Sequence, residues 1–370
     1  MKKTMYDTEI QNIRNAASST PIVLLEGPRG TGKTAMARQA FPLLNFIDLD
    51  DPKVRALAGR SPRTFLLAFP QGAVINEVSR VPGLLDSVRY YVDRRGANVR
   101  YILTSSLSPG TDDMGGRLST IRTAGLSATR MEAEKLSVYN PFQVIHQGQL
   151  NEVLYGTRSC ADIIEECLAL DIAGHINASN LGLFRIFLSA LARQSGRRLS
   201  MNAAARETGI SSPTAKSWLS LVLSYNLARI AGDPDDNGRL VFLTDTGILC
   251  HLLGIETWKD LVLNPMRDNV VRTYAFNELV RGRFSRKAEA GIVPSPIADF
   301  KANWKERFSI IVDPNLDVTE EKADLARRVS CKSRKAVVLY LGDVTYSMGT
   351  LDCISFMDWT KLSSEVNYFS

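Results

Sequence analysis

One short segment carries the residues with the clearest chemistry. Residues 27–34 match the pattern G-x-x-x-x-G-K-T, which closes in Lys33 and Thr34. In this pattern glycines let backbone N–H groups turn inward on phosphate oxygens, the lysine reaches the β and γ phosphates, and the threonine hydroxyl binds Mg²⁺. We therefore predict that the segment binds ATP and Mg²⁺. The predicted contact residues are Gly27, Pro28, Arg29, Gly30, Thr31, Gly32, Lys33, Thr34 and Ala35.

The flanks of this segment predict the elements that position it. Ile22–Leu25 is an apolar run typical of a parallel strand that is buried on both faces, and residues 35–40 are good helix formers. A strand, a loop and a helix in this order are the context that the motif requires, so a chance glycine-rich turn is a poor alternative.

A second apolar run, residues 72–78, has the form of a Walker B strand that ends in acidic residues. Asn76 occupies the first acidic place. Its oxygen can hydrogen-bond a metal-bound water but brings no charge, so we expect Mg²⁺ binding to weaken by about 1–3 kcal/mol. Glu77 is the predicted base that polarises the attacking water, which favours slow hydrolysis over none.

Two further features are candidates for contact with the γ-phosphate. A strand over residues 99–106 ends in a hydroxyl cluster, Thr104, Ser105 and Ser106, whose members are candidates for a polar sensor, although such a cluster is as often a turn signal. Ser105 is the predicted contact residue. Arg117 follows two glycines and is the favoured arginine finger, acting within its own subunit or on a neighbouring one, because a guanidinium stabilises charge on phosphoryl oxygens.

Composition limits the class of protein. A chain of 370 residues predicts two or three domains. No apolar run is long enough for a membrane span, and the start lacks a signal-peptide core, so we expect a cytoplasmic protein with no membrane partner. Five scattered cysteines and three histidines argue against a zinc site. A net charge of +6 permits a nucleic-acid partner without requiring one.

The order of these motifs resembles a widespread family of bacterial and archaeal AAA-type ATPases, whose members join an N-terminal P-loop domain to a C-terminal domain of unknown function. The segments that carry the resemblance are 27–34, 47–52, 74–86, 101–106, 183–192, 202–222 and 240–255. The family usually has aspartate at the place of Asn76 and glycine at the place of Ser105, which puts the geometry at Mg²⁺ and at the sensor in question.

The expected fold is α/β, with a parallel-sheet, AAA-like P-loop NTPase domain, a winged-helix domain and a small C-terminal α/β module. The predicted boundaries are 1–135 for the ATPase domain, 136–180 for a helical linker or lid, 181–255 for the winged helix, and 256–370 for the last module. Many family members end in a restriction-nuclease-like segment. Asp299 matches its first acid, but no E-x-K follows, so we do not expect nuclease activity.

Residues 199–243 have their own signature. A helix, a turn at Gly209, a second helix and two short strands around a polar turn predict a winged helix. The second helix offers Lys216 as its one cation, so a structural or protein-binding role is at least as well supported as DNA binding.

These patterns favour one function and leave one alternative. The favoured function is an ATP-binding, slowly hydrolysing switch that is coupled to a C-terminal partner-binding module. The alternative is an ATP-regulated DNA-binding protein without significant hydrolysis. A small-molecule kinase is disfavoured because the chain lacks an arginine-rich lid near the loop. The partner, whether DNA or protein, and oligomerisation remain open.

Overall fold

A computed structural model describes residues 6–95, 99–107, 115–136, 140–232, 238–281, 292–295, 298–303, 307–330 and 335–362. The chain divides into two units. The first comprises Met1–Thr123 with Ser224–Asn226, and the second comprises Ala124–Leu223 with Leu227–Ser370. The division into four parts that the sequence suggests stays a prediction.

The first unit is built on a parallel sheet. Its strands are β1 (Ile22–Glu26), β2 (Asn45–Asp48), β3 (Gly72–Asn76), β4 (Arg100–Ser105) and β5 (Leu118–Arg122), in the order β2-β3-β4-β1-β5. All five residues of β1 are buried, as its apolar run predicts. The predicted α/β fold with a parallel sheet is confirmed for this unit.

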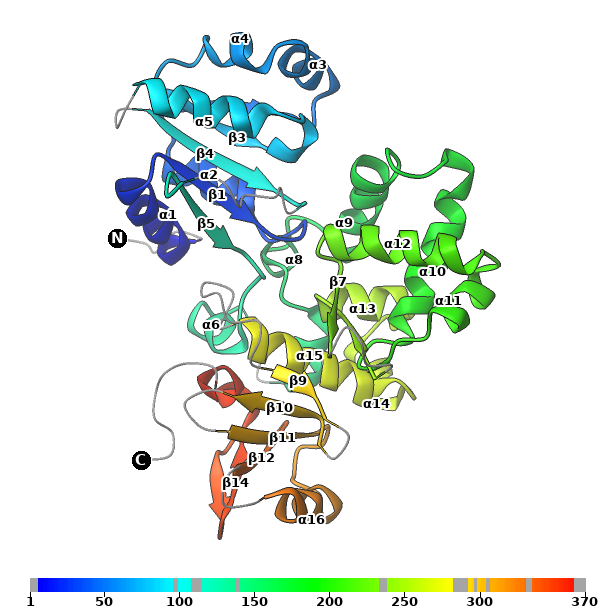
Figure 1. The fold of residues 1–370 in the computed structure, drawn as a ribbon. Coiled ribbons are helices and arrows are strands. Elements are labelled where there is room, and N and C mark those ends of the chain that lie inside the picture. The colour runs from blue at the N-terminus through cyan, green and yellow to red at the C-terminus, as the bar shows by residue number, and fades with distance from the viewer. Residues whose placement is uncertain are drawn as a thin grey trace. The chain divides into compact units, whose positions relative to one another are not determined.

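Helices cover both faces of this sheet (Figure 1). The helices α1 (Asp7–Ser19) and α2 (Lys33–Ala40) contact each other and β1. The helices α3 (Pro52–Arg60), α4 (Pro62–Leu66) and α5 (Leu84–Arg95) share a second core with alternate residues of the strands, including Ile22 and Leu24. The sheet is therefore buried between two helical layers.

The parallel arrangement brings the carboxyl ends of all five strands to one edge. Glu26 pairs in register with Ser105 of β4 and with Arg122 of β5. Asp48 of β2 pairs with Asn76 of β3. This edge is where ligands bind in open parallel sheets, and it carries the glycine-rich segment.

The first half of the second unit is mainly helical. Its helices are α6 (Ala128–Ala133), α7 (Pro141–Gln147), α8 (Asn151–Leu154), α9 (Cys160–Glu166) with the π-helical η3 (Cys167–Ile172), the short η4 (Ala178–Asn180), α10 (Leu181–Ala192), α11 (Met201–Thr208), α12 (Ser212–Ser224), α13 (Thr246–Leu252), α14 (Trp258–Leu263) and α15 (Arg267–Arg281). Three antiparallel strands, β6 (Arg197–Arg198), β8 (Leu240–Leu243) and β7 (Ala228–Ala231), lie in that order. The rings of Phe184, Phe187 and Trp218 pack together between α10 and α12.

The second half of this unit contains a six-stranded mixed sheet. The strands are β9 (Ile292–Pro294), β10 (Phe300–Asn303), β11 (Arg307–Asp313), β12 (Lys335–Tyr340), β13 (Tyr346–Met348) and β14 (Leu351–Ile354), in the order β13-β14-β12-β11-β10-β9. The helix α16 (Glu320–Val329) packs on β11 and β12, and η6 (Phe356–Leu362) follows the last strand. The small α/β region expected near the C-terminus is therefore present.

Within the described residues, no helix combines the length and the apolar character that crossing a bilayer needs.

The burial of β1 predicts a large cost for truncating it. Leu24 is fully buried, so Leu24→Ala should lower the free energy of unfolding by about 2–5 kcal/mol. Leu43 is 98% exposed, and Leu43→Ala should change it by less than about 0.5 kcal/mol. Urea unfolding followed by circular dichroism checks both variants. Equal effects of the two substitutions would contradict the placement of β1 in the core.

Candidate nucleotide-binding site

The glycine-rich segment forms the turn between β1 and α2. Gly30 and Gly32 adopt φ values of 82° and 78°, the left-handed region in which an L side chain is strained. Gly32 is the N-cap of α2, and Lys33 is the first residue of the helix. The first turn of α2 therefore directs its N–H groups and the positive end of its dipole toward an anion at this edge.

The loop lies close to the ends of β4 and β5. The amide of Gly27 donates to the carbonyl of Ser105 at 3.2 Å. The hydroxyls of Thr31 and Thr123 lie 2.8 Å apart, and Thr31 also donates to the carbonyl of Pro28 at 3.0 Å. A Cβ atom at position 27 would lie 2.2 Å from the carbonyl oxygen of Thr123. Only glycine fits there without moving the backbone.

Lys33 is buried but hydrogen-bonded. Its side chain is 5% exposed, and Nζ donates to the carbonyl oxygens of Gly27 and Pro28 at 2.8 and 2.9 Å and to Oγ of Ser106 at 3.3 Å. These neutral acceptors replace water around the ammonium group. Phosphate oxygens would be stronger partners, because a charge-assisted hydrogen bond is roughly twice as strong as a neutral one.

Glu77 is anchored to the end of β4. Its carboxylate accepts hydrogen bonds from the amide of Ser106 at 2.9 Å and from the hydroxyl of Ser106 at 2.7 Å. Glu77 is 4% exposed. Its own amide donates to Thr104 Oγ1 at 3.1 Å, and its φ of 54° is unusual for a residue other than glycine. Ser106 therefore connects Glu77 to Lys33, and the backbone at Glu77 is held in a strained conformation.

The Asn76 side chain is hydrogen-bonded to three other polar side chains. Its Oδ1 accepts from the hydroxyls of Thr34 at 2.6 Å and Thr104 at 2.7 Å, and its Nδ2 donates to Oδ1 of Asp48 at 2.9 Å. Hydroxyl, amide and carboxylate oxygens are the donors that Mg²⁺ prefers. The residues on this side of the loop therefore fit Mg²⁺, and the roles of Thr34 as a direct ligand and of Asn76 as a ligand through water stay predictions.

A buried ion pair limits what Arg29 contributes. Its guanidinium lies 3.2 Å from Asp50, and Arg80 binds the same carboxylate at 3.0 Å. Burial raises the pKa of Asp50, while the two arginines act in the opposite direction. The side chain of Arg29 is thus bound to the segment after β2, which leaves its backbone as its contribution to the loop.

Comparison with known families identifies the first unit. Residues 19–131 match a family described as "AAA domain", and residues 151–259 match a family described as "Domain of unknown function". The first match covers the motif and all five strands of the parallel sheet. Residues 19–131 form an AAA-type P-loop ATPase domain.

Two uncharacterized mycobacterial proteins are similar over a longer stretch. Mb2031c of Mycobacterium bovis and Rv2008c of Mycobacterium tuberculosis are each 26% identical over 273 residues, which cover 68% of this chain. The chain spans 60% of the length of these relatives.

Two solved structures are similar to part of this chain. A Walker-type ATPase of Pyrococcus abyssi is 12% identical, with a TM-score of 0.43 over 67% of this chain and 95% of its own. The RuvB Holliday junction branch migration motor of Thermotoga maritima is 16% identical, with a TM-score of 0.34 over 63% of this chain and 90% of its own.

Of the three hydroxyl residues at the end of β4, Thr104 and Ser106 contact other site residues through their side chains, whereas the Ser105 hydroxyl makes its hydrogen bonds elsewhere. The Ser105 hydroxyl donates to Ser79 Oγ at 3.0 Å and also contacts the carbonyl of Leu107, so it points away from Lys33 and Glu77. Its neighbours Thr104 and Ser106 make the contacts to Asn76, Glu77 and Lys33. The side chains of a strand alternate between its faces, so Ser105 lies on the opposite face from Thr104.

Arg117 does not lie at the site within its own subunit. The register pairs Ile22 with Leu118 and Glu26 with Arg122, so Arg117 is at the amino-terminal edge of the sheet. The glycine-rich loop is at the opposite edge, about 16 Å away for five residues of strand. Arg117 forms an ion pair with Asp93 there. A finger acting within one subunit is thus excluded by this position, and action on a neighbouring subunit stays a prediction.

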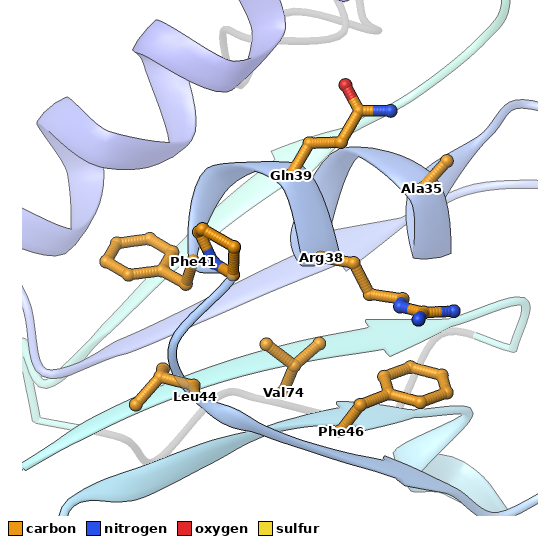
Figure 2. A pocket seen from close by; sticks show the side chains of 8 residues that line it. Ala35, Arg38, Gln39, Phe41, Leu44, Phe46 and Val74 are labelled. Atoms are coloured by element: carbon orange, nitrogen blue, oxygen red, sulfur yellow. The ribbon is translucent and has the colours of Figure 1, made fainter.

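A pocket of about 470 Å³ lies beside the loop helix rather than at the phosphate loop (Figure 2). It opens between α2 and the strands β2 and β3, and Arg38 lies over the ring of Phe46 at 4.6 Å. Its lining residues are Ala35, Arg38, Gln39, Phe41, Pro42, Leu44, Phe46 and Val74. Phe46 lies within β2 and Val74 lies within β3, so the pocket lies on one face of the sheet and not at the edge where the strands end.

Two glycine substitutions test the geometry of the loop. Gly27→Ala places a Cβ against Thr123 and should lower the free energy of unfolding by about 1–3 kcal/mol and weaken ATP binding. Gly59→Ala in α3 meets no atom within 4 Å and should be neutral or stabilise the protein by about 0.5–1 kcal/mol. Urea unfolding and ATP titration measure both effects. If Gly27→Ala behaved like Gly59→Ala, the close approach to Thr123 would be wrong.

Proposed function

We propose that the protein is an ATP-binding, slowly hydrolysing ATPase that acts as a nucleotide-dependent switch and is coupled to a C-terminal partner-binding module. The observation that carries the proposal is the linkage of Lys33 to Glu77 through Ser106 at the edge of the sheet. A cation for the β and γ phosphates and a carboxylate for the attacking water share one hydroxyl there. Loss of the γ-phosphate would therefore change the contacts of both Lys33 and Glu77.

The proposed binding step exchanges partners around Lys33. The ammonium would leave the carbonyls of Gly27 and Pro28 for phosphate oxygens, while the amides of the loop and of the first turn of α2 receive the remaining oxygens. Mg²⁺, when bound with the nucleotide, would neutralise charge that develops between the β and γ phosphates. Thr34 and Asn76 are the residues that would hold it.

The proposed hydrolytic step depends on Glu77. Its carboxylate must accept a proton from water or orient that water, and it is a base of the right type for this role. Both of its carboxylate oxygens accept hydrogen bonds from Ser106. These bonds hold the carboxylate in place and leave acceptor sites on it for a water, which supports its proposed role as the base.

The order of elements after residue 180 supports a winged helix as the coupled module. The chain runs α10, β6, α11, α12, β7 and β8, and the three strands form one antiparallel sheet. Gly209 ends α11 with a φ of 76°, and α12 follows after a short turn. We propose that this segment binds the partner, with protein favoured over DNA because Lys216 is the one cation among the residues of α12.

A hydrogen bond inside the first unit supports coupling. Asn226 Nδ2 donates to the carbonyl of Ser106 at 3.1 Å. Asn226 lies between the end of α12 and the start of β7 in the chain. The residue that contacts both Lys33 and Glu77 is thus also in contact with the segment that joins two elements of the proposed winged helix.

The binding claim is tested at Lys33. Lys33→Ala removes the charged donor to the phosphates and should weaken ATP binding about 10- to 100-fold, since hydrogen bonds to charged groups contribute about 1.5–3 kcal/mol. Isothermal titration calorimetry with ATP and Mg²⁺ gives the affinity. The matched control is Lys53→Ala, an exposed lysine of α3, which should bind ATP as the unchanged protein does. Equal affinity of the two variants would refute nucleotide binding at this loop.

The hydrolysis claim is tested at Glu77. Glu77→Gln keeps the shape of the side chain but removes the base, so phosphate release should fall about 10²- to 10⁴-fold while ATP affinity stays within about threefold. Phosphate release is measured in single turnover, with and without duplex DNA. Unchanged release in the variant would show that Glu77 is not the base. Absence of release from the unchanged protein in both conditions would favour the alternative of a binding-only, DNA-associated switch.

A further inference from the structure

We propose that Asp48, at the end of β2, is the carboxylate of the Mg²⁺ side of the site and holds Asn76 with its carbonyl oxygen toward Thr34. The inference rests on the proposed binding of ATP with Mg²⁺ and assigns the negative charge that Asn76 itself does not supply. Asp48 is a positioning residue in this proposal, since it acts through Asn76 and through solvent rather than on the phosphates.

The strand register places the two residues side by side. Asp48 is the last residue of β2 and pairs with Asn76, the last residue of β3. Asn76 Nδ2 donates to Asp48 Oδ1 at 2.9 Å, and the backbone amide of Asp50 donates to the same oxygen at 3.0 Å. A hydroxyl, an amide and a carboxylate thus form one hydrogen-bonded series that starts at Thr34.

The hydrogen bonds determine which way the Asn76 amide faces. With Oδ1 toward Thr34 and Thr104, it accepts two hydrogen bonds while Nδ2 donates to a carboxylate. In the reversed orientation Oδ1 would face Asp48, and two acceptors would oppose each other without a proton between them. Asp48 therefore fixes the orientation in which Asn76 presents an oxygen, the atom that a metal-bound water requires, toward Thr34.

The neighbouring acids are engaged elsewhere. Asp50 is bound by both Arg29 and Arg80, so its charge is offset. The carboxylate of Asp51 accepts from the amide of Lys53 and caps α3 at 2.7 Å. Among the described residues, no lysine or arginine forms an ion pair with Asp48, which is half-buried. Its charge is therefore available to the cation side of the site.

The test compares ATP binding with Mg²⁺ and with EDTA. Fluorescence titration with a labelled ATP analogue gives the affinity in EDTA and the Mg²⁺ concentration that produces half of the metal-dependent gain. Asp48→Asn should raise that Mg²⁺ concentration at least tenfold and leave the affinity in EDTA within about twofold. Asp51→Asn is the matched control, and it should leave the Mg²⁺ dependence unchanged.

A charge swap separates this role from a purely structural one. Asp48→Asn combined with Asn76→Asp returns one carboxylate to the pair on the other strand, and it should restore Mg²⁺ dependence to within about threefold of the unchanged protein. Asn76→Asp alone sets two carboxylates against each other. It should therefore lower the melting temperature in EDTA and recover it when Mg²⁺ and nucleotide are added.

The outcomes distinguish the two proposals. If the unchanged protein binds no ATP in either medium, the proposed function and this inference are both overturned. If it binds ATP with Mg²⁺ dependence and Asp48→Asn shows the same dependence, only the inference is overturned. If Asp48→Asn does not fold, the charge swap decides, and failure of the folded swap variant to restore Mg²⁺ dependence overturns the inference.

Discussion

A single hydroxyl between two buried charges is the interaction on which the rest of the site depends. Ser106 donates to Glu77 through its amide and its side chain, and it accepts from Lys33 at 3.3 Å. Burial of a charge is costly unless hydrogen bonds replace the lost water. Ser106, the residue after β4, thus hydrogen-bonds to both Lys33 and Glu77 and brings these two charged side chains to one place. The glycines of the loop then let the backbone pass close enough for Lys33 to find its carbonyl partners.

The magnesium side follows a different physical rule. An asparagine at the place of an acid brings no charge, and the weaker Mg²⁺ binding that follows from this stays a prediction. The structure adds that Asn76 is not isolated, because its amide joins the hydroxyl of Thr34 to the carboxylate of Asp48. Although Asn76 is neutral, its hydrogen bond to Asp48 fixes which of its amide atoms faces Thr34. In our proposal, the charge for Mg²⁺ therefore comes from Asp48 on β2, the strand next to that of Asn76.

Local patterns predicted most of the AAA domain, and non-local register decided the rest. The apolar run at Ile22–Leu25 and the glycine spacing were enough for the buried strand, the loop and the helix, because each signal lies within a few consecutive residues. Arg117 and Asp48 depend instead on which strands pair and in which register. The two glycines before Arg117 gave no information on the edge at which it lies. An acid at the end of an expected strand was a signal for Asp48, but its partner on β3 is 28 residues away.

The two hydrogen bonds of Glu77 fix where its carboxylate lies. Ser106 donates to one carboxylate oxygen through its amide and to the other through its hydroxyl. An ionised carboxylate can accept about four hydrogen bonds, so a water can bind to Glu77 while both bonds from Ser106 are kept. The carbonyl of Ser106 accepts a hydrogen bond from Asn226, which lies between α12 and β7. Under the proposed function, a displacement of that segment would therefore reach the proposed base through Ser106.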